Sequence, residues 1–262
     1  MNVVFYKFHG TGNDFIMVDN RDSIFPKNDT NLINKLCDRR FGIGSDGLIL
    51  LENAGENEDD FKMVYFNADG NQSSMCGNGG RCIVAFAKYL GIIDKTASFT
   101  AIDGKHLAVI NGQEVSLKMQ DVDASDLNEA ALFLDTGSPH HIEFTDEVGD
   151  IDVKGQGSKI RYSSKYEESG GTNVNYVQQD GDNDFLVRTY ERGVEDETYS
   201  CGTGVTAVAL AVHALGRTMA REIKLKTRGG DLKVSFDEKG EQYFNICLTG
   251  PAEYVFKGEI EC

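Results

Sequence analysis

The chain has 262 residues, of which 40% are hydrophobic and 26% are charged, as is usual for one large globular domain or two ordinary ones. Its formal net charge of −16 argues against a nucleic-acid partner, because a polyanion repels a phosphate backbone. No apolar run reaches the roughly 18 residues of a membrane span, and residues 1–19 lack a basic segment followed by an apolar run, so we expect no membrane contact, no secretion signal and a cytoplasmic location.

The predicted elements of the first half are short strands around one long helix. Residues 14–18 are rich in apolar side chains, and residues 60–66 alternate in the manner of a strand. The helix is expected to begin at Cys76 and is apolar on almost every side, as in a helix buried in a core. Gly91 stands where a residue with positive φ is favoured after a helix end. Residues 99–105 belong to the two or three strands expected next.

The second half repeats this order at offsets of 124 to 126 residues, which indicates an internal duplication. The best match joins Cys76-Gly-Asn-Gly to Cys201-Gly-Thr-Gly, 125 residues later, and each motif opens an apolar helix that ends in Leu-Gly. The match of residues 141–144 to residues 14–18 is weaker. The other matching segments are residues 60–66 with 184–190 and residues 99–105 with 225–231.

We therefore predict an α+β fold of two pseudo-symmetric domains, each a curved mixed or antiparallel sheet, or a barrel, wrapped around a central helix. The first domain is expected at residues 1–122 and its repeat at residues 123–262, because the composition turns polar and acidic between residues 121 and 135. A strand from the C-terminus can join the first domain. The active site is expected in the cleft between the domains.

The six cysteines are expected to be thiols, as is usual in the cytoplasm. They form no Cys-x-x-Cys pair and have no histidine at finger spacing, so we predict no metal site. Cys76 and Cys201 differ from the rest, because they match each other in the repeat and each precedes an apolar helix. The other four are interpreted as small buried hydrophobic residues: Cys37, Cys82, Cys247 and Cys262.

A cysteine at the start of a helix is well placed for acid–base chemistry. The free N–H groups and the positive end of the helix dipole favour the thiolate, and the glycines that follow leave these N–H groups open to a bound carboxylate. Two such cysteines on opposite faces of one carbon can act as base and acid, and so invert a stereocentre. We therefore predict epimerisation of an amino acid without pyridoxal phosphate, with the developing charge held by N–H donors worth roughly 2.7–4 kcal/mol each.

Six motifs occur in a characteristic order along the chain. They are His9-Gly-Thr-Gly-Asn-Asp-Phe15, Gly42-Ile-Gly-Ser-Asp-Gly47, Phe66-Asn-Ala-Asp-Gly70, Cys76-Gly-Asn-Gly79, Glu191-Arg-Gly193 and Cys201-Gly-Thr-Gly204. With them the chain resembles the diaminopimelate epimerases over essentially its full length. The resemblance implies interconversion of LL- and meso-diaminopimelate in lysine and peptidoglycan-precursor synthesis, a two-domain fold, no cofactor and a homodimer.

The resemblance also implies roles for individual residues. Cys76 and Cys201 match the acid and base of the family. His140 matches a histidine that adjusts cysteine ionisation, and Glu191 matches a glutamate near the cysteines. Asn175 lies close enough to Asn173 to leave the register of that motif open. The implied substrate contacts are Asn13, Asn67, Gly77, Asn78, Asn173, Glu191, Arg192, Gly202 and Thr203, with Arg192 at the distal carboxylate.

Two positions depart from the family pattern. Gly47 stands where many members carry glutamine, and Ser138 stands where the family has asparagine before Pro-His. In the family both side chains help to hold substrate, so the far amino-acid end of the pocket is expected to differ here. Asp46, beside Gly47, is a candidate to compensate.

Other functions share parts of this pattern. A two-cysteine racemase of another amino acid, similar to proline racemase, has the same fold and chemistry, and phenazine-type isomerases share the fold without the cysteine pair. A regulatory disulfide between Cys76 and Cys201, or a binding protein that has lost activity, are alternatives of another class. Asn67 and the Glu191-Arg192 pair favour diaminopimelate, because a substrate with a second amino-acid end needs polar groups beyond the reacting carbon.

Overall fold

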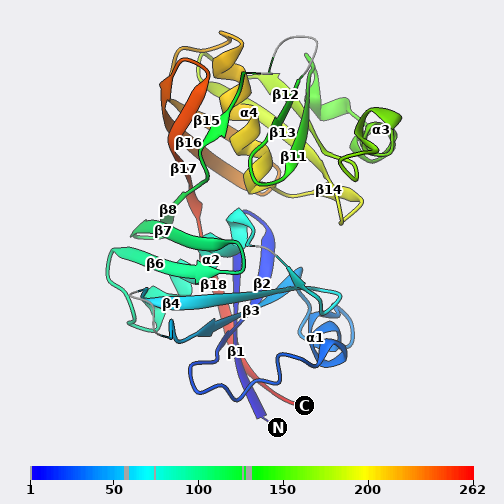
Figure 1. The fold of residues 1–262 in the computed structure, drawn as a ribbon. Helices are drawn as coiled ribbons and strands as arrows, with labels where there is room; N and C mark the ends of the chain where they lie inside the picture. Colours follow the sequence, from blue (N-terminus) through cyan, green and yellow to red (C-terminus); the bar gives the residue numbers. More distant parts are fainter. Residues whose placement is uncertain (1, 56–58, 74, 126, 128–131) are drawn as a thin grey trace. The chain divides into compact units, whose positions relative to one another are not determined.

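The structure is a computed structural model, and it describes the whole chain apart from residues 1, 56–58, 74, 126 and 128–131 (Figure 1). The chain divides into two compact units, of which the first comprises Met1–Leu117 and Pro251–Cys262 and the second Lys118–Gly250. The boundary predicted at residues 122 and 123 lies a few residues after this division. Strands outnumber helices in both units, which confirms the predicted α+β class. No helix in the described ranges is long and apolar enough to cross a membrane.

The first unit is a mixed sheet with a helix on each face. Its elements are β1 (Asn2–Gly10), β2 (Asn13–Asp19), α1 (Thr30–Cys37), β3 (Gly47–Glu52), β4 (Phe61–Asn67), β5 (Gln72–Ser73), α2 (Gly77–Tyr89), β6 (Thr96–Ala101), β7 (Gly104–Asn111), β8 (Glu114–Lys118) and β18 (Glu253–Glu261). The strands lie in the order β18-β1-β2-β3-β4-β6-β7-β8, with β5 also beside β4. The β2–β3 and β4–β6 pairs are parallel, and the others are antiparallel.

The second unit has the same plan. Its elements are β9 (Val122–Asp123), β10 (Phe133–Asp135), β11 (Pro139–Phe144), η1 (Val148–Asp150), α3 (Val153–Arg161), η2 (Ser164–Tyr166), β12 (Asn173–Gln179), β13 (Asp184–Glu191), β14 (Asp196–Thr198), α4 (Gly202–Ala214), β15 (Glu222–Thr227), β16 (Gly230–Lys239) and β17 (Gln242–Pro251). The order is β10-β11-β12-β13-β15-β16-β17-β9, with β14 also beside β13. Here the β11–β12 and β13–β15 pairs are parallel.

The strand registers confirm the internal duplication. Phe15 pairs with Gly47 across the parallel β2–β3 ladder, and His140 pairs with Asn173 across the parallel β11–β12 ladder. The next ladder repeats as well, since Leu48 pairs with Phe66 as Val174 does with Tyr190. The weak sequence match of residues 141–144 to residues 14–18 is thus confirmed, because these segments are β11 and β2.

The central helix of each unit ends in the predicted way. In α2 the N–H of Gly91, at φ 72°, donates to the Lys88 carbonyl at 3.0 Å, and the N–H of Ile92 donates to Ala87 at 3.0 Å. Gly216 at φ 68° and Arg217 make the same two bonds at the end of α4. This Schellman arrangement satisfies the last carbonyls, and it requires a residue that tolerates positive φ. Both helices therefore end within two residues of their last buried residue.

Each sheet has two buried faces. In the first unit α2 packs on β1, β2, β3 and β7, while α1 covers a separate apolar cluster on the opposite face. In the second unit α4 packs on β10, β11, β12, β15 and β16, and α3 covers the cluster that contains Tyr176 and Tyr190. Alternation along the strands fixes which side chains meet the central helix, because successive residues point to opposite faces. Figure 1 shows α4 lying against the strands of its own unit.

Candidate active site

Cys76 is the N-cap residue of α2. Its backbone is extended, at φ −103° and ψ 149°, and its Sγ accepts a hydrogen bond from the N–H of Gly79 at 3.2 Å. This N–H is one of the four that an α-helix leaves without an internal partner. A Cβ at Gly79 would lie 3.2 Å from this sulfur and 3.1 Å from Cδ1 of Ile49, so glycine gives the sulfur its close approach. The N–H donor and the helix dipole both favour a negative charge on the sulfur.

Asn78, in the first turn of α2, connects this helix end to the start of β2. Its side chain is buried, and its Nδ2 donates to Oδ1 of Asn13 at 3.2 Å. Asn13 in turn donates from Nδ2 to a carboxylate oxygen of Asp46 at 2.6 Å. Two predicted substrate contacts, Asn13 and Asn78, are therefore held in one hydrogen-bonded chain that ends on Asp46.

A cluster of charges lies behind this chain of amides. Arg39 bonds Asp14 at 2.6 Å and Asp46 at 2.7 Å, and the buried ammonium of Lys7 lies 2.7 Å from Asp14. Burial alone raises the pKa of the Asp14 carboxyl, but the hydrogen bonds from Arg39 and Lys7 outweigh it and lower the pKa to about 2. Both acids are engaged in ion pairs, and the exposed Asp46 also fixes the orientation of the Asn13 amide.

The departure at Gly47 has a steric cause. A Cβ at Gly47 would lie 2.5 Å from the carbonyl oxygen of Phe66 and 2.6 Å from Cε2 of Tyr65. No side chain fits there, and the ring of Tyr65 occupies the space. Asn67, the last residue of β4, pairs with Gly47 and has an exposed side chain at the edge of the same region. Sequence reasoning missed Tyr65, whose position follows only from the register of β3 on β4.

Cys201 is the N-cap residue of α4 and is more buried than Cys76. Its Sγ lies 3.5 Å from Oγ1 of Thr203, the second residue of the helix. A Cβ at Gly204 would lie 2.5 Å from Oδ1 of Asn175 and 3.3 Å from Cε1 of His140. Glycine is required beside this cysteine, because a polar cluster packs directly on the helix end.

That cluster is centred on His140, whose side chain is fully buried. Burial first, and the charge of Arg192 second, lower the pKa of His140 to about 3, so the ring is neutral at physiological pH. Nε2 lies 2.9 Å from Oγ1 of Thr203, and Nδ1 lies 3.2 Å from the amide nitrogen of Asn175. Because that amide nitrogen can only donate, the proton of the ring is assigned to Nε2, which donates to Thr203. His140 therefore reaches Cys201 through the Thr203 hydroxyl.

Asn175 is a positioning residue, not only an alternative register for the motif. Its Nδ2 also donates to the carbonyl of His141 at 3.0 Å, and its Oδ1 accepts from the hydroxyl of Thr189 at 3.0 Å. Asn173, two residues earlier on the same strand face, uses its amide to bond Ser138 and the Pro139 carbonyl, both at 2.9 Å. The two-residue spacing in a strand could have indicated that both asparagines share a face.

The Glu191-Arg192 pair lies at the end of β13. The backbone N–H of Arg192 donates to Oδ1 of Asn173 at 2.8 Å, which fixes this turn to β12. The guanidinium of Arg192 bonds the carbonyls of Ser169 at 3.3 Å and Gly171 at 3.4 Å. Glu191 is half-buried as the last residue of its strand. Alternation along β13 puts Glu191 on the same sheet face as Thr189, which bonds Asn175 beside the start of α4. The charge of Arg192 acts on His140.

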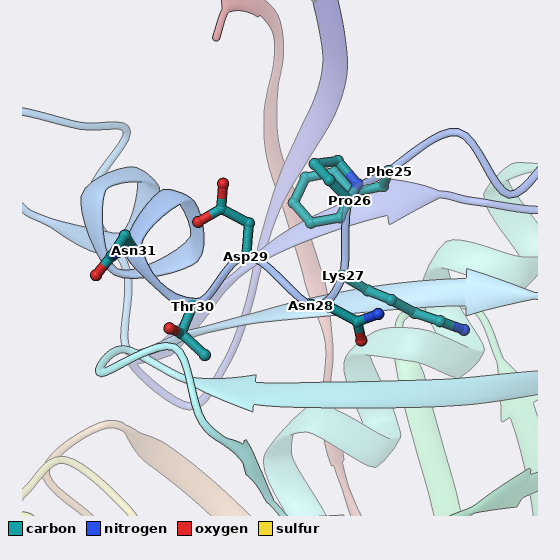
Figure 2. Close-up of a pocket in the computed structure, with 7 residues that line it drawn as sticks. All are labelled: Phe25, Pro26, Lys27, Asn28, Asp29, Thr30 and Asn31. Atoms are coloured by element: carbon teal, nitrogen blue, oxygen red, sulfur yellow. The ribbon is translucent and has the colours of Figure 1, made fainter.

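The remaining features of the described chain lie apart from these helix ends. All six cysteines are free, and burial raises the pKa of both Cys37 and Cys82, which suits inert core thiols. Within the described residues no group of three metal-ligating side chains is found. A shallow hollow lined by residues 25–31, shown in Figure 2, contains none of the predicted site residues.

Comparison with known sequences places these motifs in a family context. The chain matches the family model described as diaminopimelate epimerase over residues 5–123 and 132–255. It is 57% identical over 256 residues to the diaminopimelate epimerase of Flavobacterium psychrophilum, covering 97% of this chain and 99% of that relative. To the diaminopimelate epimerase of Chlorobaculum tepidum it is 40% identical over 261 residues, covering 96% and 98%.

Solved structures share the fold at much lower identity. A phenazine biosynthesis protein of the PhzF family from Bacillus anthracis superimposes with a TM-score of 0.73 at 13% identity and full coverage of both chains. A hydroxyproline epimerase from Agrobacterium vitis gives a TM-score of 0.69 at 15% identity, over 99% of this chain and 92% of that one. These likenesses show that the chain shares its fold with both proteins.

Proposed function

We propose that this chain, which belongs to the diaminopimelate epimerase family, interconverts LL- and meso-diaminopimelate by moving one α-proton between two cysteines. The observation that carries the proposal is the repeated helix start. Cys76 and Cys201 are the N-cap residues of α2 and α4, at equivalent positions of two units with the same strand order. Two equivalent thiol groups are what a reversible two-base inversion needs.

In the proposed reaction one cysteine begins as thiolate and the other as thiol. The thiolate removes the α-hydrogen as the C–H bond breaks, and the electron pair passes into the carboxylate as an enediolate-like anion. The thiol then delivers its proton to the other face of the carbon, so the two sulfurs exchange protonation states. The N–H groups at the starts of α2 and α4, including those of Gly77 and Gly202, are proposed to hold the carboxylate while its charge grows.

The other predicted site residues receive proposed roles from their contacts. Neutral His140 orients the Thr203 hydroxyl beside Cys201 and so adjusts its ionisation. Asn13 and Asn78 present amide groups near the start of α2, and Asn67 lies at the end of β4 on the same sheet face. The remaining proposed substrate contacts are Asn173, Glu191, Arg192, Gly202 and Thr203.

The far amino-acid end of the substrate is proposed to meet a modified surface. Tyr65 fills the place of a side chain at Gly47, and Ser138 is bonded to Asn173. The hydroxyl of Tyr65 lies beside Gly47, and serine keeps a polar side chain at position 138, so we propose that diaminopimelate is still recognised. A cytoplasmic location and a homodimer complete the proposal, as in the sequence-based expectation for a biosynthetic enzyme.

Substitution of either cysteine tests the mechanism. Cys76→Ala and Cys201→Ala are each expected to lower epimerisation of LL-diaminopimelate by at least about 10³-fold, because general acid–base groups contribute 10²–10⁴-fold. Cys247→Ala, which removes a half-buried thiol outside the motifs, is the matched control and should retain activity. Chiral chromatography of the products under reducing conditions gives the rates. Substantial activity in either motif variant would contradict the two-base mechanism.

Substrate identity and proton transfer need separate measurements. A panel of LL-diaminopimelate, proline, glutamate and histidine separates the proposed substrate from those of other two-cysteine racemases. Turnover of proline alone would replace the proposed function with proline racemisation. In D₂O the newly formed stereocentre should carry deuterium, and product without deuterium would exclude the proton-transfer route.

A further inference from the structure

Arg81, in the second turn of α2, is a buried cation that the proposed mechanism does not use. Its side chain has no exposed surface. Among the residues that the structure describes it forms no ion pair with a carboxylate, although an isolated buried charge is costly. Its hydrogen bonds go to four neutral oxygens: Oγ1 of Thr11 at 3.2 Å, Oδ1 of Asn78 at 2.9 Å, and the carbonyls of Gly77 at 3.3 Å and Pro251 at 3.4 Å.

Two cysteines of the described chain, Cys82 and Cys76, would act on the Arg81 charge if they were ionised. Burial lowers the pKa of Arg81 to about 10, and the charges that oppose this shift are those of Cys82 and Cys76 when ionised. Cys82 is fully buried, and burial raises the pKa of its thiol far above physiological pH, so it stays neutral. Cys76 is left as the group whose negative charge Arg81 can stabilise.

The duplicated helix lacks this charge. Thr206 stands at the offset of 125 residues from Arg81. The Thr206 hydroxyl donates to the carbonyl of Gly202 at 2.9 Å, the same bond that Arg81 makes to Gly77. The imidazole of His140, which bonds Thr203 at the start of α4, is neutral. The same hydrogen bond is thus made by a cation behind Cys76 and by a neutral group behind Cys201.

We propose that Arg81 is a positioning residue whose buried charge favours the thiolate of Cys76, and that Thr206 at the equivalent position leaves Cys201 as the thiol of the resting pair. The inference rests on the proposed function for its consequence, since it assigns which cysteine first acts as base. Arg81 also holds the Asn78 amide, and through it Asn13, in the orientation described above.

Other titratable groups surround Cys76 and Arg81. Asp14 on β2 acts on the neighbouring Cys82, but its charge is balanced by Lys7 on β1. Asp103, at the turn from β6 to β7, accepts a hydrogen bond from the Met75 backbone and pairs with His106 on β7 at 3.2 Å. On the remaining strands, β3 contributes the apolar Ile49 and β18 contributes the phenol of Tyr254, which stacks on Tyr89. None of these groups is a hydrogen-bond partner of Arg81.

The test measures thiol ionisation without turnover. Ligand-free, reduced protein is alkylated with iodoacetamide across a pH series, and the modified Cys76 and Cys201 peptides are quantified by mass spectrometry. In the unaltered chain Cys76 should reach half-maximal reactivity at lower pH than Cys201. In Arg81→Met the Cys76 midpoint should rise by about one pH unit, which is a tenfold loss of rate below the midpoint, while the Cys201 midpoint stays in place.

Two further variants separate charge from packing. Arg81→Lys keeps a cation, so the pH midpoint of Cys76 alkylation should stay close to that of the unaltered chain. If Arg81 acted only through packing, the midpoint would not depend on whether position 81 carries a charge. Lys88→Met removes a cation from the last turn of the same helix and should leave both midpoints unchanged.

The inference is overturned if Cys201 proves the more acidic thiol in the unaltered chain, or if Arg81→Met folds and leaves the Cys76 midpoint unmoved. If Arg81→Met does not fold, two other results test the inference. They are the order of the Cys76 and Cys201 midpoints in the unaltered chain and the Cys76 midpoint in Arg81→Lys. A shifted midpoint in a protein that does not epimerise diaminopimelate would overturn the proposed function alone. Full epimerisation with no shift would overturn this inference alone.

Discussion

Replacement of Gly204 by alanine should separate catalytic geometry from stability. The added Cβ would lie 2.5 Å from Oδ1 of Asn175, closer than carbon and oxygen can pack, and 3.3 Å from Cβ of Cys201. Asn175 cannot rotate away freely, because its amide bonds the His141 carbonyl and accepts from Thr189, each at 3.0 Å. The new methyl group therefore displaces the amide together with the His140 ring that it holds.

The two consequences differ in size. Overpacking costs about 1–3 kcal/mol, while glycine to alanine inside a helix returns about 1 kcal/mol, so the net loss of stability is about 0–2 kcal/mol. A displacement of about 1 Å in groups that support catalysis can lower the rate about 10²-fold. Gly204→Ala is thus expected to lose far more activity than stability.

The assay pairs epimerisation rates with urea unfolding. Gly149→Ala is the matched control, because a Cβ at Gly149 meets nothing within 4 Å, and it should change neither quantity appreciably. In the Gly204→Ala background, Asn175→Ala removes the contacted oxygen and should cost little more than either single change. Retention of more than about half of the activity by Gly204→Ala, against the expected 10²-fold loss, would refute the reasoning.

Three other expectations concern stability. Burial holds the pKa of His140 at about 3 and that of His141 at about 4, below the ordinary 6.5, so below pH 6.5 the unfolded chain binds protons that the folded chain does not. The free energy of unfolding measured in urea should therefore fall by about 1.4 kcal/mol per histidine for each pH unit below 6.5. A stability that does not change with pH in this range would contradict the expectation. Gly47→Gln should destabilise by about 2 kcal/mol or more through contact with the Phe66 carbonyl, to be checked as a lowered urea midpoint. Asp14→Asn should cost about 1–2 kcal/mol at pH 7, and this difference should fade as pH drops from 3.8 through about 2, because the native contribution of the carboxylate is present only above that range.

The duplication could be predicted because short sequence motifs recur in both halves of the chain. Cys-Gly-x-Gly before an apolar run fixes a helix start, and Leu-Gly fixes its end, so Cys76 and Cys201 were found with their helices. The likeness of β2 and β11 is weak in sequence but plain in the ladders, since Phe15 and His140 occupy the same register with unrelated side chains. The equivalence of β2 and β11 follows from which strands they pair with, and strand pairing depends on contacts between residues far apart in the sequence.

Residues that act through a neighbour could not be predicted in this way. Tyr65 and Asn175 matter because of the strand beside them, and a shift of one residue in register would turn either to the opposite face. Arg81 lies in a helix whose sequence is apolar on almost every side. From the sequence alone, a charged residue in such a helix is expected at the surface. Only the structure shows that its side chain is buried and bonded to Gly77 and Asn78.

The two units keep the same backbone and differ in how they support a charge. Behind Cys76 the proposed support is a fixed cation, the buried Arg81, whose hydrogen bonds include those to Gly77 and Asn78. Behind Cys201 it is a neutral network in which Asn175 and His140 occupy positions that are apolar in the first unit. A reversible inversion requires that the sulfurs exchange protonation states at similar free energy. A cation on one side and adjustable hydroxyl and imidazole donors on the other satisfy this requirement, because the neutral donors can reorient when Cys201 becomes the anion while Arg81 cannot change its charge.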